Sequence, residues 1–187
     1  MILKLRIVGI NVLIESSWEQ VLILLSKDFS SFVTYDLLFR ADVEIKAIRC
    51  KTDKIKFPEL KIKYQSKNSI TYQDKKIRYN DYYGKVKAIY DYNTEKAEVF
   101  GDDLDRVHEI IYLLILSRSG KMLDLRGVHK THAFAISFKN IAFVCMMPSG
   151  GGKSTMLVEL LQNENVKLIS DDIPLVSLEI GLIPMPL

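Results

Sequence analysis

Residues 147–155, which read MPSGGGKST, have the composition of a loop that binds phosphate. An apolar run, 141–146, precedes them like a strand, and residues 156–162 follow with the spacing of a helix. In this setting glycines let the backbone fold around phosphates so that its N–H groups point inward, and the helix N-terminus adds positive potential. The run predicts a P-loop, also called a Walker A motif, and a nucleoside triphosphate such as ATP as its ligand.

Each residue of this run has an expected part in nucleotide binding. Lys153 is placed to reach the β- and γ-phosphates, and the hydroxyl of Ser154 to help hold Mg²⁺. The other predicted nucleotide-binding residues are Ser149, Gly150, Gly151, Gly152 and Thr155. The usual pattern, G-x-x-x-x-G-K-[ST], has Gly where this chain has Met147, and we expect the three consecutive glycines to supply the flexibility. The alternative is a glycine-rich turn in which Lys153 is merely solvated.

Two adjacent carboxylates, Asp171 and Asp172, follow the next predicted strand, residues 166–169. In a parallel sheet they would emerge beside the phosphates, at the carboxyl edge of the strands. One carboxylate there can hold Mg²⁺ through water, and the other can accept the proton of an attacking hydroxyl group, because neighbouring carboxylates rarely share one environment. The alternative is an acidic turn that ends the strand.

His132 begins the strand that comes before the apolar run, 141–146. From there it could approach the γ-phosphate and the two acids and tune a proton transfer. Taken alone, a histidine at a strand start is an ordinary surface residue. His108 and His129 have no such placement.

The order of these features resembles the HPr kinase/phosphorylase family. Residues 132–172 carry the resemblance: HAFAI at 132–136, a short turn, a hydrophobic strand, PSGGGKST at 148–155, and LISDD at 168–172. Wider relatives of that family include the HPr-kinase-like enzymes of peptide-maturation clusters, such as lasso peptide kinases. The family has a P-loop fold related to phosphoenolpyruvate carboxykinase and transfers phosphate from ATP to a serine hydroxyl.

The resemblance implies a role for each matching position. Lys153 would be the phosphate ligand and Ser154 the Mg²⁺ ligand. Asp171 would be the catalytic base, Asp172 its metal-site or electrostatic partner, and His132 the histidine that pairs with the base.

Two departures from the family pattern indicate a relative of HPr kinase rather than the bifunctional enzyme. Thr155 stands where the bifunctional enzymes usually carry Glu, and Met147 where they carry Gly. The expected function is phosphoryl transfer from ATP to a serine of a small protein or peptide. Two alternatives stay open: a small-molecule kinase or carboxykinase-like enzyme, and a non-catalytic nucleotide-binding protein.

Composition excludes several other classes of protein. The 187 residues are 48% hydrophobic, enough for a real core, and a formal net charge of +3 is too mild to imply a nucleic-acid partner. The cysteines, Cys50 and Cys145, together with the lack of a signal peptide, fit a reducing compartment. The longest apolar run, near 110–116, is far too short to span a bilayer. We expect a cytoplasmic protein without a membrane partner.

Basic residues cluster in one stretch of the N-terminal half, where they alternate with apolar ones. They are Lys46, Arg49, Lys51, Lys54, Lys56, Lys61 and Lys63. The pattern is typical of the solvated face of a sheet, and the alternative is a surface for an acidic partner.

The expected fold is α/β: a strand-rich α+β N-terminal domain, residues 1–103, followed by a P-loop domain of the HPr kinase/carboxykinase type, residues 104–187. The N-terminal strands are expected within 2–14, broken near Gly9, and at 43–47, 60–64, 70–72, 86–92 and 97–100. Ser17 and Gln20 suggest a capping box for a first helix.

The second domain is expected to open with a helix, 104–117, that stops at Gly120. Strands 133–138 and 141–146 should follow, joined by a two-residue turn, with the second of them central in its sheet. After His132 the sequence offers about four strands and one helix, whereas a doubly wound nucleotide fold needs about five strands with covering helices. We therefore expect an incomplete domain with weak nucleotide binding, little or no kinase activity, and exposed apolar edges that favour homo-oligomers.

Overall fold

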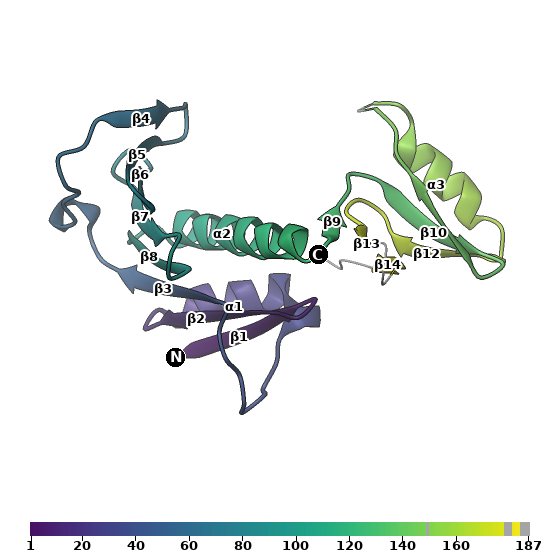
Figure 1. The fold of residues 1–187 in the computed structure, drawn as a ribbon, viewed down its shortest axis with the longest axis horizontal. Helices are drawn as coiled ribbons and strands as arrows, with labels where there is room; N and C mark the ends of the chain where they lie inside the picture. The colour runs from purple at the N-terminus through teal and green to yellow at the C-terminus, as the bar shows by residue number, and fades with distance from the viewer. Residues whose placement is uncertain (149, 178–180, 184–187) are drawn as a thin grey trace. The chain divides into compact units, whose positions relative to one another are not determined.

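The computed structural model describes residues 1–148, 150–177 and 181–183 (Figure 1). Within these residues the chain is a mixed, strand-rich α/β protein with one eight-stranded sheet, two three-stranded sheets and three α-helices. It divides into two compact units, Met1–Ser119 and Gly120–Leu187. The division lies inside the second helix, whereas the sequence places a boundary before that helix, at residue 103. No helix in the described part is long and apolar enough to cross a membrane.

The Met1–Ser119 unit is built on the eight-stranded sheet. Its strands are β1 (Ile2–Ile7), β2 (Ile10–Ser16), β3 (Val43–Arg49), β4 (Ile62–Gln65), β5 (Ile70–Asp74), β6 (Ile77–Asp81), β7 (Val86–Asp91) and β8 (Lys96–Gly101). They lie in the order β1-β2-β3-β8-β7-β6-β5-β4. β3 is parallel to both of its neighbours, and the other pairs are antiparallel.

Alternation of apolar and polar residues determines which face of this sheet is buried. In β1 and β2 every second side chain is buried, from Leu3 to Ile14, and the turn between the strands has Val8 and Gly9 at φ 49° and 79°. Two left-handed residues are what a two-residue hairpin turn needs. The predicted break near Gly9 is thus confirmed.

Two helices supply the other half of this core: α1 (Glu19–Asp28) and α2 (Leu104–Leu125), with short 3₁₀ turns η1 (Ser30–Phe32) and η2 (Thr52–Lys54) elsewhere in the unit. The capping box predicted for α1 is wrong. Trp18 is its N-cap and no side chain caps the helix. The oxygen of Ser16, not Ser17, accepts a hydrogen bond from the Trp18 N–H at 2.9 Å. The same hydroxyl donates a hydrogen bond to the carbonyl of Ala47, so the contacts of the buried Ser16 at the end of β2 fix the backbone that leads into α1.

The predicted end of α2 at Gly120 is also wrong. The helix continues to Leu125, and Gly127, at φ 71°, lies directly after the last turn. A left-handed glycine in that place is the usual end of a helix. A Cβ at Gly120 would lie 2.3 Å from the Nζ atom of Lys130, so this glycine leaves room for a neighbouring side chain.

The Gly120–Leu187 unit holds two small antiparallel sheets and one helix. Its elements are β9 (Val128–Lys130), β10 (Phe134–Phe138), β11 (Ile141–Cys145), α3 (Lys153–Leu161), β12 (Val166–Ser170), β13 (Leu175–Ser177) and β14 (Gly181–Ile183). The strand orders are β11-β10-β12 and β14-β13-β9. A core of Phe134, Ile136 and Leu157 lies between α3 and the first of these sheets.

The hairpin of β10 and β11 is confirmed, with Lys139 and Asn140 in its left-handed two-residue turn. The central position predicted for β11 is wrong: within the described residues β11 and β12 are both edge strands, and β10 lies between them. Ile141 is therefore 60% exposed, Phe143 43% and Leu168 49%. The sheet is antiparallel rather than parallel, because β11 and β12 both run antiparallel to β10.

Candidate functional site

The antiparallel sheet brings three separate segments to one edge. β10 starts where β11 and β12 end, since Phe134 lies opposite Cys145 and Ala135 lies opposite Ser170. His132 precedes β10, the glycine loop (residues 147–152) follows β11, and the two acids follow β12. The Ala133 N–H also donates to the carbonyl of Asp172 at 3.0 Å. The predicted meeting of these segments at one edge is found, although an antiparallel strand and not a parallel pair produces it.

The glycine loop has the backbone shape that only glycine adopts without strain. Gly150 and Gly152 have φ values of 76° and 85°, in the left-handed region. No atom lies within 4 Å of a Cβ built on either residue, so the dihedral angle rather than crowding calls for glycine. The Gly151 N–H donates to the Pro148 carbonyl at 2.9 Å, which closes the turn. Ser149 lies outside the described residues.

The loop leads directly into α3. Gly152 is the N-cap of this helix, and no side chain caps it. The first N–H groups of an uncapped helix lack partners within the helix, and with the helix dipole they form a positive end. The side chains of Ser154 and Thr155 are exposed in the first turn, next to these groups. This end of α3 can therefore bind an anion.

Lys153, His132 and Asp172 form the one cluster of predicted site residues whose side chains touch in the described structure. The Nζ atom of Lys153 donates to Oδ1 of Asp172 at 3.0 Å and lies 3.3 Å from Nε2 of His132. Nδ1 of His132 is 3.0 Å from the same carboxylate oxygen. The Lys153 side chain is only 16% exposed, whereas the other two are more than half exposed.

The electrostatics of the cluster favour an ionised Asp172. The hydrogen bond from Lys153 is the main cause that lowers the pKa of this carboxyl group. Burial, the next largest cause, raises the pKa, and the charges of Lys153 and His132 lower it further. The carboxylate therefore stays negative at neutral pH and neutralises the ammonium group. Sequence reasoning did not predict the contact between Lys153 and Asp172, because it assigned the lysine to phosphates alone.

Asp171 lies at the same edge but outside this cluster. Its side chain is exposed and, among the residues that the structure describes, makes no hydrogen bond or ion pair with another side chain. His132 is expected to pair with the catalytic base, Asp171. It pairs with Asp172 instead.

The residues of this edge fit a magnesium–nucleotide complex better than a metal ion alone. Among the described residues no group of three or more His, Cys, Asp or Glu side chains is placed to hold a metal. Mg²⁺ is commonly bound by one or two carboxylates together with substrate phosphates. Asp172 and the Ser154 hydroxyl match that smaller set of donors.

No protein-family model matches the chain, and no curated protein matches it either.

Proposed function

We propose that the Gly120–Leu187 unit binds ATP and Mg²⁺ at the glycine loop, and that the chain is an HPr-kinase-like protein. Its reaction is transfer of the γ-phosphoryl group of ATP to a serine hydroxyl of a small protein or peptide. The finer fold assignment, a P-loop domain related to HPr kinase and phosphoenolpyruvate carboxykinase, is part of this proposal, as is a cytoplasmic location.

The observation that carries the proposal is the contact of Lys153 with Asp172 beside the start of α3. An ammonium group, the N-terminus of a helix and a loop with left-handed glycines together suit a polyphosphate. The competing interpretation, a glycine turn with a solvated lysine, predicts an exposed Lys153. The side chain is mostly buried instead, and its charged end contacts Asp172.

The residues of this edge divide the work of phosphoryl transfer. Backbone N–H groups at the start of α3 and the Lys153 ammonium group bind the phosphates. Ser154 and Asp172 would hold Mg²⁺, which would supply positive charge to offset the charge on the phosphate oxygens. Asp171 accepts the proton of the acceptor serine while the serine oxygen bonds to phosphorus and ADP leaves.

The two acids differ in their contacts, and this difference supports different roles. Asp172 is bonded to an ammonium group and lies against His132, which suits a carboxylate that interacts with cations. Asp171 is exposed and has no side-chain partner among the described residues, so its carboxylate can meet an incoming hydroxyl group. His132 then acts on Asp172 as a positioning residue.

Transfer of radioactive phosphate tests this proposal. The full chain is incubated with Mg²⁺ and ATP labelled at the γ-phosphate, with HPr as one acceptor and a mixture of serine-containing peptides as another. We expect slow transfer of label to serine, and Asp171→Asn should reduce the transfer to background because it removes the proton acceptor. Asp53→Asn, at an exposed acid of the Met1–Ser119 unit, is the matched control and should leave the rate unchanged.

The outcomes separate the competing functions. Binding of ATP without transfer to any hydroxyl acceptor would favour a non-catalytic nucleotide-binding protein. Transfer only to small hydroxyl compounds would favour a small-molecule kinase. A chain that binds no ATP at all would contradict every one of these functions.

A further inference from the structure

β4 ends the eight-stranded sheet, and no strand in the described residues pairs with its outer edge (Figure 1). Among the described strands it pairs with β5 alone, with a register shift between Ile62 and Tyr64, so backbone N–H and C=O groups of this four-residue strand point away from the sheet. Ile62 and Tyr64 on this strand are 53% and 63% exposed. The edge thus offers both hydrogen-bonding groups and apolar side chains to a partner.

Lysines are frequent in the segment of the chain that contains β4. Residues 51–67 contain six lysines and two acids, a formal charge of +4. All six lysines are exposed: Lys51, Lys54, Lys56, Lys61, Lys63 and Lys67. None of them forms an ion pair with another described residue, whereas Lys87 and Lys96 of the same sheet pair with acids. The positive charge is therefore uncompensated.

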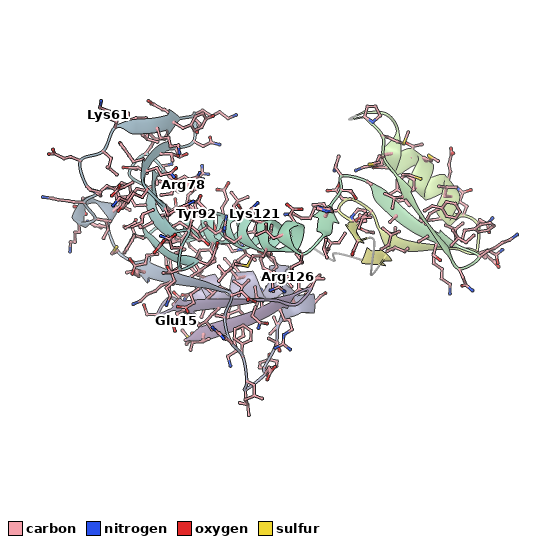
Figure 2. All side chains as sticks on the ribbon, in the orientation of Figure 1. Glu15, Lys61, Arg78, Tyr92, Lys121 and Arg126 are labelled. Carbon is pink, nitrogen blue, oxygen red and sulfur yellow. The ribbon has the colours of Figure 1, made fainter. Side chains whose placement is uncertain are left out.

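The loop before β4 packs against the sheet through Phe57. The ring of Phe57 lies 6.2 Å from that of Tyr72 in β5 and 5.2 Å from that of Tyr79 in β6. Tyr72 is the residue opposite Ile62 of β4, so the loop that carries Lys56 packs next to this strand. Lys61 lies directly before β4 (Figure 2).

Protection of an exposed edge explains only part of this pattern. Natural sheets often carry lysine on an edge strand to prevent unwanted pairing, and Lys61 and Lys63 fit that purpose. Most of the other lysines lie on loops, where they guard no strand. The exposed Ile62 and Tyr64 would weaken such protection.

We propose that the outer edge of β4 binds an acidic, extended segment of another protein as an added strand. Backbone hydrogen bonds to β4 hold the segment, and its carboxylates face Lys61 and Lys63. This binding uses the Met1–Ser119 unit and needs no nucleotide, so its test is independent of the proposed function.

Fluorescence anisotropy with the full chain tests this inference. The probe is a fluorescein-labelled ten-residue peptide in which Glu alternates with Val, and a second probe carries N-methyl groups on alternate residues. We expect saturable binding of the first probe and at least about tenfold weaker binding of the second, because N-methylation removes the N–H donors of a strand. Lys61→Glu with Lys63→Glu should also weaken binding by about tenfold or more.

A matched control makes the same change of charge elsewhere. Lys27→Glu with Lys121→Glu, at exposed lysines of α1 and α2, should leave binding of the first probe unchanged. Equal binding of both peptides and of a thymidine oligonucleotide would overturn the inference, because the surface would then attract any polyanion without adding a strand. Failure of the first probe to bind would overturn it as well. The comparison of the two peptides uses the unchanged chain and so does not depend on the folding of any variant.

Discussion

Lys153 and Asp172 neutralise each other in the structure, and this contact is what a nucleotide would have to change. A lysine that binds phosphate donates charge-assisted hydrogen bonds to the ligand. Asp172 would then be released from its ammonium partner and become available to a divalent cation. Lys153 and Asp172 thus pair with each other in the structure. In the proposed nucleotide complex each has a different partner, phosphate for Lys153 and a divalent cation for Asp172.

The pKa of Asp172 should depend on Lys153. The hydrogen bond from Lys153 is the main cause that lowers this pKa, so Lys153→Met should raise it towards the ordinary value of an aspartate, about 3.9. A carboxyl group with a lowered folded-state pKa stabilises the fold above its ordinary pKa, and this contribution is lost as the pH falls through the lowered value. Because Asp172 is largely exposed, the effect on stability should be small.

Titration of the aspartate carboxyl carbons by NMR measures this change directly. Asp91 is the internal control. A hydrogen bond from the N–H of Asn93 is the main cause that lowers its pKa, and Lys153→Met lies elsewhere in the chain. A pKa of Asp172 that is the same in both proteins would show that the contact does not persist in solution.

At the scale of elements, the sequence predicts hairpins but not which strands lie next to each other in a sheet. The strands β1 and β2 alternate strictly around a glycine turn, and such a local pattern is sufficient to predict a hairpin. The position of β11 at a sheet edge depends instead on how many strands pair with it. Its apolar sequence cannot report this number, and the prediction of a central strand therefore failed.

The end of α2 shows the same limit. Glycine is a residue that often ends a helix, but the small size of Gly120 accommodates Lys130 from β9, a contact that only the fold creates.

The order of the segments along the chain, by contrast, correctly predicted that His132, the glycine loop and the two acids share an edge. The hydrogen bond between Lys153 and Asp172 depends on side-chain geometry, which no sequence spacing specifies.

Substitution of the two glycines near the end of α2 should change the free energy of unfolding by different amounts. Gly127→Ala forces a Cβ into the left-handed region and should lower the free energy of unfolding by about 1 kcal/mol. Gly120→Ala should cost little or even stabilise, because alanine favours the helix and only the flexible end of Lys130 must move. Native-state hydrogen exchange of the β10 amides measures both. A larger loss from Gly120→Ala than from Gly127→Ala would contradict this account of the helix end.

At the scale of the whole molecule, exposed apolar side chains predict self-association. Phe143 and Leu168 lie on either side of the buried Ile136 in the three-stranded sheet and are themselves partly exposed, and Ile141 is also exposed on β11. Apolar residues that gather on a surface in this way mark association sites. Sedimentation velocity should therefore show a species larger than the monomer whose fraction grows with protein concentration.

Replacement of Ile141, Phe143 and Leu168 by threonine should shift the chain towards the monomer. Leu37→Thr with Leu38→Thr is the matched control, since both leucines are exposed in the other unit. A wild-type chain that stays monomeric at every concentration, or a triple variant that associates as strongly as the wild type, would contradict the prediction.

Calorimetric titration of the chain with ATP and Mg²⁺ tests the central claim most directly. We expect saturable, magnesium-dependent binding to the wild type and to Lys167→Met, which removes an exposed lysine from β12 in the same unit. Lys153→Met should weaken binding by at least about tenfold, because it removes the ammonium group that meets the phosphates. Equal affinity of all three proteins, or no binding by any of them, would contradict a nucleotide site at the glycine loop.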